Sequence, residues 1–239
     1  MARGLRTRFT FDPAGARESV WSPDCSRIVF NSNRKGHFDL YQKSSNGSGA
    51  EEVLLEDIHD KYPESWSPDG RFILYRSQSS TTGNDLWILP LSGDRKPIPF
   101  LVTKFSENDG RFSPDGRWVA YSSDESGTPE VYVVPFPGPG GERQVSTAGG
   151  SLPRWGPTGM EIFYLTADRR LWVAAVNSKG ASFDAGVVKP LFDSRASFGL
   201  RYPYDVSADG QRFLVNAIPE QSAAAPITVV SNWTAGLKK

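Results

Sequence analysis

The side chains best suited to chemistry in this sequence form a short charged run, Asp57, His59, Asp60 and Lys61. Carboxylates and an imidazole at this spacing could hold a cation or the charged end of a peptide. The simpler interpretation is a solvated loop of mixed charge. The choice between the two depends on where the fold places the loop.

Similar polar side chains recur later in the chain at comparable intervals, namely Glu107, Asp109, Arg154, Arg201 and Tyr202. If each group lies in the link between two repeats of a ring, the links surround the mouth of a central channel. We therefore expect these residues, with the run at 57–61, to bind a protein or peptide, or to hold a cation in the channel.

Other reactions and partners find little support in the residues. The only histidines, His37 and His59, are too few for a histidine-rich metal site, and no GxSxG elbow marks a hydrolase nucleophile. Cys25 is the single cysteine, so neither an internal disulfide nor a paired-cysteine metal site is available. We expect no catalytic residue and no cofactor beyond that channel cation. The 27 basic and 27 acidic residues balance, which argues against nucleic acid as a partner.

The elements that must position these side chains follow a repeat. Trp66-Ser67-Pro68-Asp69-Gly70 has near copies at residues 21–24 and 112–116, and weaker copies at residues 155–159 and 206–210. The equivalent positions lie 45, 46, 43 and 51 residues apart, measured between Ser22, Ser67, Ser113, Gly156 and Ser207. This period is typical of a four-stranded propeller blade.

Strand-like runs follow each turn in the same order. The expected second strands, rich in β-branched and aromatic residues, are at residues 27–33, 71–77, 117–123, 161–167 and 211–217. Third strands are expected at residues 38–44, 85–91, 130–136, 170–176 and 227–233. Fourth strands are expected at residues 50–56, 98–104, 142–147 and 187–193, and the last repeat lacks one.

The missing strand indicates how the ring closes. Residues 5–11 form an unassigned strand, which we expect to complete the last blade and so remove two exposed sheet edges. The chain is then one all-β domain, a β-propeller of five antiparallel blades, at about residues 17–60, 61–105, 106–149, 150–195 and 200–233 plus 5–11. The alternative is an incomplete six-bladed ring, which is open here and could associate with another copy.

The repeated turn has a structural explanation. Proline presets one turn dihedral, aspartate accepts backbone N–H groups, and glycine tolerates positive φ. We assign the turn carboxylates to chain reversal rather than to metal binding or acid catalysis: Asp24, Asp69, Asp115 and Asp209. Large aromatic residues precede the turns and are expected to fill the space between blades: Trp21, Trp66, Phe112 and Trp155.

Residues 66–75 and Asp85-Leu86-Trp87 resemble the WD40-like Pro-Asp repeat of TolB-like propellers, and the resemblance extends from about residue 5 to residue 233. More narrowly, the chain is similar to the C-terminal propeller of bacterial serine/threonine protein kinases, whose end resembles residues 232–237. The sequence has no Gly-rich phosphate loop, HRD-type segment or DFG, so kinase activity is not expected.

The resemblance implies a non-catalytic sensor or docking module of a larger bacterial signalling or envelope protein, with a periplasmic location and a protein or peptide partner. Two alternatives stay open. One is a propeller enzyme of the lyase or hydrolase type with a metal at the channel mouth, and the other is a truncated fragment without autonomous function. The sequence shows no signal peptide and no run long enough to span a bilayer, so membrane insertion is not expected.

Overall fold

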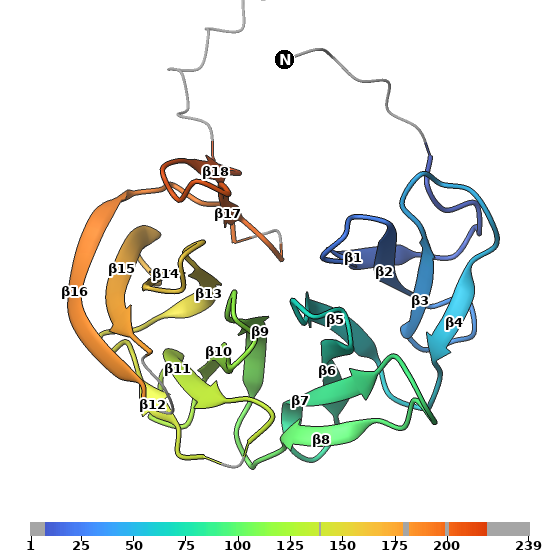
Figure 1. The fold of residues 1–239 in the computed structure, drawn as a ribbon, viewed down its shortest axis with the longest axis horizontal. Coiled ribbons are helices and arrows are strands. Elements are labelled where there is room, and N and C mark those ends of the chain that lie inside the picture. The colour runs from blue at the N-terminus through green and yellow to red at the C-terminus, as the bar shows by residue number, and fades with distance from the viewer. Residues whose placement is uncertain (1–7, 139, 179–181, 199–200, 219–239) are drawn as a thin grey trace, which may run out of the picture.

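The computed structural model describes residues 8–138, 140–178, 182–198 and 201–218. These residues form five antiparallel β-sheets and no helix, so no described helix could cross a membrane. Figure 1 shows the sheets following one another around a central axis, with the first strand of each sheet innermost. The propeller of five repeats expected from the sequence is confirmed.

Each of the first four sheets has four strands in sequence order. The first contains β1 (Ala16–Trp21), β2 (Arg27–Ser32), β3 (Asp39–Ser44) and β4 (Glu52–Leu55). The second contains β5 (Lys61–Trp66), β6 (Phe72–Ser79), β7 (Gly83–Pro90) and β8 (Ile98–Leu101). The third contains β9 (Glu107–Phe112), β10 (Trp118–Ser123), β11 (Glu130–Pro135) and β12 (Arg143–Gln144). The fourth contains β13 (Ser151–Trp155), β14 (Glu161–Leu165), β15 (Arg170–Asn177) and β16 (Asp184–Asp193).

The fifth sheet is described only in part, as β17 (Tyr204–Val206) and β18 (Phe213–Val215). The third strand expected for this sheet, at residues 227–233, lies outside the described residues. The outer strands vary most in length, because the sequence after each third strand is the least regular part of the repeat. Thus β12 has two residues, whereas β16 has ten.

The Ser-Pro-Asp turn reverses the chain between the first and second strands of a sheet. In the second repeat, the Ser67 hydroxyl donates to Asp69 Oδ1 (2.7 Å), which also accepts the Arg71 N–H (3.0 Å). Asp24, Asp115 and Asp209 accept equivalent hydrogen bonds. The Ser22 hydroxyl and the Ser26 N–H and hydroxyl lower the pKa of Asp24 to about 2, because they stabilise its anion.

Four apolar clusters form the core, one in each interval between neighbouring described sheets. Trp66 at the end of β5 packs with Val29 and Leu40 of the first sheet. Phe112 and Trp155 fill the next two intervals in the same way, as the sequence predicts. Trp21 differs because no described sheet precedes β1, and it remains 56% exposed.

The N-terminal segment does not complete the last sheet in the described part of the chain. Residues 8–11 form no strand, and the Phe9 ring lies 6.1 Å from that of Phe30 on β2. Lys43 Nζ on β3 also donates to the Phe9 carbonyl (3.0 Å). These contacts hold residues 8–11 against the first sheet, so the interval between β18 and β1 contains no described strand (Figure 1).

Candidate functional site

Three carboxylates from different innermost strands converge on one arginine. Arg201, in the segment before β17, lies 2.8 Å from Asp109 on β9 and 2.5 Å from Glu64 on β5. Its Nε lies 3.5 Å from Glu18 on β1. Because the first strands of the sheets surround the axis, one guanidinium can reach three sheets at once. Arg201 therefore ties the last described sheet to the first three.

A second cation and several hydrogen bonds complete this network. Arg76 on β6 lies 3.2 Å from Glu64 and 3.7 Å from Glu18. Burial alone would raise the pKa of Asp109, but the Arg201 guanidinium and a 2.6 Å hydrogen bond from Ser122 lower it. Burial raises the pKa of Glu18, and the neighbouring Glu64 carboxylate raises it further.

Two more guanidiniums lie beside this network, over the ring of Tyr202. The guanidinium carbons of Arg111 and Arg154 are 4.9 Å and 5.3 Å from the ring centre. The Tyr202 hydroxyl donates to the Pro63 carbonyl (3.2 Å), which fixes the ring between the first strands. Burial lowers the pKa of Arg154, and the positive charge of Arg111 lowers it further. The Arg154 Nε lies 3.7 Å from Asp205, and the negative charges of Glu64 and Asp109 help to raise the pKa of Arg111. Both guanidiniums thus favour an anion beside them.

Two cavities lie along the axis. Arg201 and Asp109 line one and Glu64 lines the other, so the Arg201 ion pairs connect the two. The larger, about 620 Å³, lies toward the turn ends of the innermost strands and is lined by Trp21, Trp66, Glu64, Arg111, Arg154, Tyr202 and Tyr204, among others. The smaller, about 200 Å³, lies toward the starts of these strands and is lined by Ser106, Asn108, Asp109 and Arg201, among others. A ligand in the larger cavity would meet aromatic rings and the guanidiniums of Arg111 and Arg154, the second of which lies 3.7 Å from Asp205.

The structure brings four of the residues expected at the channel together: Asp109, Arg154, Arg201 and Tyr202.

The run at 57–61 occupies a different place, the junction of the first and second sheets. Lys61 Nζ is fully buried, 2.9 Å from Asp39 Oδ1 and 2.7 Å from Asp57 Oδ1. It also donates to the His59 carbonyl (2.5 Å), while Asp60 accepts the Phe38 N–H (2.8 Å). These bonds join the two sheets.

Glu107, at the start of β9, lies at the junction of the second and third sheets. Its Oε1 accepts a hydrogen bond from the Thr103 hydroxyl (2.5 Å). Burial raises the pKa of Glu107 to about 7, and the negative charge of Asp85 contributes to the increase. Glu107 therefore belongs to a local pair of carboxyl groups, separate from the carboxylates around Arg201.

Six described residues around the axis or on the wall of the larger cavity are not singled out by the sequence, namely Glu18, Glu64, Arg76, Arg111, Tyr204 and Asp205. The spacing of acidic residues in the sequence could have identified Glu18 and Glu64. An acidic residue precedes the turn aspartate by five or six positions in three successive repeats, as Glu18, Glu64 and Asp109. This similar spacing places the three side chains at the irregularly paired part of their first strands.

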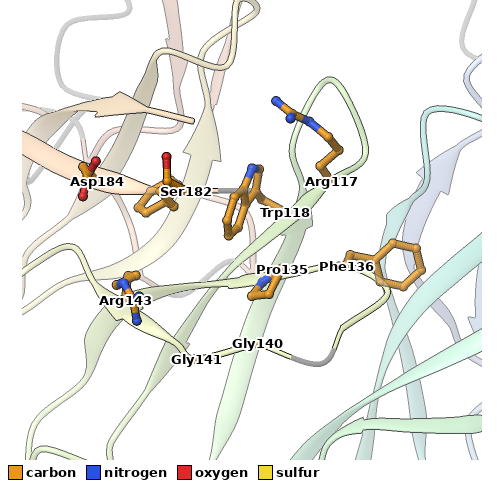
Figure 2. Close-up of a pocket in the computed structure, with 10 residues that line it drawn as sticks. Arg117, Trp118, Pro135, Phe136, Gly140, Gly141, Arg143, Ser182 and Asp184 are labelled. Atoms are coloured by element: carbon orange, nitrogen blue, oxygen red, sulfur yellow. The ribbon is translucent and has the colours of Figure 1, made fainter. Parts of the chain in front are cut away.

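Figure 2 shows a further cavity, about 510 Å³, between the third and fourth sheets. Trp118 and Pro135 form an apolar wall, and Arg117 and Arg143 lie at its edges. None of the residues singled out from the sequence lines it.

No protein-family model matches the chain, and neither does any curated protein. Solved structures do match. A putative TolB from Agrobacterium tumefaciens is 19% identical with a TM-score of 0.59, and TolB from Acinetobacter baumannii is 21% identical with a TM-score of 0.63. The fold is that of a TolB-like β-propeller. The matches cover 73% and 83% of this chain, which spans only 65% and 47% of those two TolB chains.

Two other solved structures also match the fold of this chain. An oligogalacturonate lyase in complex with manganese is 12% identical, with a TM-score of 0.52, over 86% of this chain and 71% of that one. A chain of a nidogen/laminin complex is 11% identical, with a TM-score of 0.54, over 75% of this chain and 76% of that one. At such identities the likeness concerns architecture, and function must be argued from the site.

Proposed function

We propose that this TolB-like propeller is a non-catalytic binding module that holds a segment of a protein or peptide in its central cavity. The observation that carries the proposal is the pair of guanidiniums, Arg111 and Arg154, on the wall of the 620 Å³ cavity. The carboxylates at the axis are already paired with Arg201 and Arg76. Arg154 Nε lies 3.7 Å from Asp205, whose carboxylate is largely exposed, so an incoming carboxylate can compete for this loose ion pair. Arg111 and Arg154 are therefore the charges best placed to receive a group from outside.

The cavity selects for an acidic segment with an apolar neighbour. A carboxylate can accept two parallel N–H bonds from a guanidinium, and such bonds strengthen where water is excluded. Trp21, which is 56% exposed at the cavity wall, offers a flat apolar surface beside this charge. The cavity volume suits a few residues of an extended chain.

We further propose that the module serves as the sensor or docking part of a larger bacterial signalling or envelope protein. Similar structures support a binding role, since two are TolB proteins and one is a complex named for two proteins, nidogen and laminin. The resemblance to kinase-associated propellers supports a signalling protein, and the resemblance to TolB supports a periplasmic location.

A lyase activity has weaker support. One similar structure is an oligogalacturonate lyase with manganese, but its identity to this chain is 12%. Among the residues that the structure describes, no group of three or more His, Cys, Asp or Glu side chains could hold a metal ion. The two carboxylates on the cavity wall, Glu64 and Asp205, each lie beside an arginine, which disfavours a role as catalytic acid or base.

Selection from a library of random peptides tests the binding proposal. We expect the selected peptides to carry an aspartate, a glutamate or a free C-terminal carboxylate. Arg154→Ala should weaken binding of a selected peptide by about tenfold or more, because a charge-assisted bond in a desolvated site is lost. Isothermal titration calorimetry measures the change.

Arg71→Ala is the matched control, because Arg71 is an exposed arginine in a turn and lines no part of this cavity. It should leave the affinity unchanged, and circular dichroism should show all proteins folded. Selected peptides without an acidic group, or equal affinity for the Arg154→Ala protein, would exclude the guanidinium pair as the binding site.

A further inference from the structure

The junctions between successive sheets are built from equivalent residues. Asp39 and Asp85 lie in the third strands of their sheets, each paired in register with a serine of the second strand. Lys61 and Glu107 begin the following first strands, each paired with a serine in turn. In both junctions the two residues are 22 positions apart in the sequence. Glu107 therefore stands where Lys61 stands one repeat earlier.

At the first junction, an ammonium group occupies a cage of oxygen atoms. Lys61 Nζ lies 2.9 Å from Asp39 Oδ1 and 2.7 Å from Asp57 Oδ1. It also donates to the carbonyl oxygens of His59 (2.5 Å) and Asp57 (3.3 Å). The positive charge of Lys61 thus neutralises the buried carboxylate of Asp39.

At the second junction, the cation is replaced by a second carboxyl group. Glu107 and Asp85 are only 2% and 3% exposed. Glu107 Oε1 accepts the Thr103 hydroxyl and Asp85 Oδ2 accepts the Thr82 hydroxyl, both in normal hydrogen bonds. Glu107 Oε2 and Asp85 Oδ1 are buried without a hydrogen-bond partner.

The third junction shows that a buried carboxylate here is normally satisfied. Glu130, equivalent to Asp39 and Asp85, accepts hydrogen bonds from the Ser146 hydroxyl and the Gly149 N–H. Of these three acidic residues, Asp85 is the one that keeps an unpartnered buried oxygen. Burying two carboxyl groups with unpaired oxygens is costly unless a positive charge joins them.

We propose that a calcium ion binds between the second and third sheets, held by Glu107 and Asp85, in the place that Lys61 Nζ occupies one repeat earlier. All the donors are oxygen atoms, which calcium prefers. Thr103 and Phe105 lie four and two positions before Glu107, as Asp57 and His59 do before Lys61, so their carbonyl oxygens correspond to two that Lys61 Nζ contacts. A divalent ion balances both carboxylates, whereas one shared proton leaves a buried negative charge. This site is independent of the peptide cavity.

Calcium titration of the chelator-treated chain at pH 8 tests the proposal. Isothermal titration calorimetry should show one site. At a calcium concentration 100 times the dissociation constant, the unfolding midpoint should rise by about 5 °C or more relative to EDTA. Magnesium should have less effect, because it requires a more regular cage.

Glu107→Lys provides the decisive variant, because it copies the first junction. It should abolish calcium binding and make the unfolding midpoint in EDTA higher than that of the wild-type chain in EDTA. Glu107→Gln should also abolish calcium binding. Asp94→Asn is the control, because Asp94 is an exposed carboxylate whose loss should leave calcium binding intact.

Two outcomes would overturn the proposal. One is calcium binding of equal affinity in the wild-type and Glu107→Lys proteins, which would place the ion elsewhere. The other is an absence of calcium binding together with stability that falls as the pH rises from about 4.5 to about 7, through the raised pKa of Glu107. That result would show that Glu107 and Asp85 share a proton instead.

Discussion

The turn copies illustrate how one backbone angle governs residue choice. Gly70, Gly116, Gly159 and Gly210 follow the Ser-Pro-Asp or related turn with φ between 68° and 75°. In the first copy this position is Cys25, with φ of 58°, where a Cβ lies close to the backbone. The hydrogen bonds of Asp24 keep the turn closed despite this residue.

Cys25→Gly should therefore stabilise the chain. The Cys25 side chain is exposed, so its removal loses little packing. Glycine relieves the strain of the left-handed conformation but increases the entropy of the unfolded chain. The net effect should raise the free energy of unfolding by about 0.5 kcal/mol. Urea unfolding measures this. Gly70→Ala is the reciprocal control and should lower the same free energy by about 1 kcal/mol. A less stable Cys25→Gly protein would contradict the argument.

At the scale of elements, the position of β9 depends on a residue without a side chain. A Cβ added to Gly110 would lie 2.5 Å from Leu74 Cδ2 and 3.2 Å from Leu86 Cδ1 of the second sheet. The neighbours of Gly110 on this strand are Asp109 and Arg111, which both reach the axis. Close packing of two sheets therefore sets the position of two charged groups.

Gly110→Ala should disturb both stability and binding. Overpacking against Leu74 should lower the free energy of unfolding by about 1–3 kcal/mol and weaken binding of a selected peptide, because β9 must move. Gly141→Ala is the control, since its Cβ would meet only the flexible end of Arg143. Thermal unfolding and calorimetry measure the two effects, and unchanged values for Gly110→Ala would show that the strand adapts freely.

At the scale of the whole molecule, an apolar cluster fills each of the four intervals between successive described sheets. The fifth sheet is connected to the first three sheets by other contacts. Arg201 reaches Glu18, Glu64 and Asp109 across the axis, and Tyr202 contacts Pro63. Among the residues that the structure describes, ion pairs and hydrogen bonds rather than an apolar cluster join these sheets. The polar axis is thus both a structural joint and the wall of the binding cavity.

Arg201→Ala should be strongly destabilising. It leaves buried carboxylates without their main counter-ion, which should lower the free energy of unfolding by about 3–5 kcal/mol. Adding Glu64→Gln should recover part of this loss, because one uncompensated charge is removed. Lys96→Ala, which alters an exposed ion pair, should change stability by less than about 0.5 kcal/mol in the same chemical unfolding experiment. A similar small change for Arg201→Ala would show that the axis contributes little to closure.

Part of the site was accessible from the sequence. Asp109, Arg154, Arg201 and Tyr202 were expected at the channel because their positions in the repeat are comparable, and the structure places them together. The same reasoning predicts Glu107 at the channel, yet the structure places it in a junction between sheets. Position in the repeat predicts the neighbourhood of a side chain, but the register and twist of the strand decide which way it points.

The sequence by itself determined the blade, because the Trp-Ser-Pro-Asp-Gly turn is closed by bonds between residues at most five positions apart, such as Ser67 to Asp69 and Phe72. Only the tertiary structure decided the site. Arg201 and Glu64 are 137 positions apart, and their contact exists because the sheets curve around one axis. The replacement of the Lys61 ammonium by Glu107 was visible in the sequence, but its consequence was not. Two unpartnered buried oxygens appear only once the sheets are packed together.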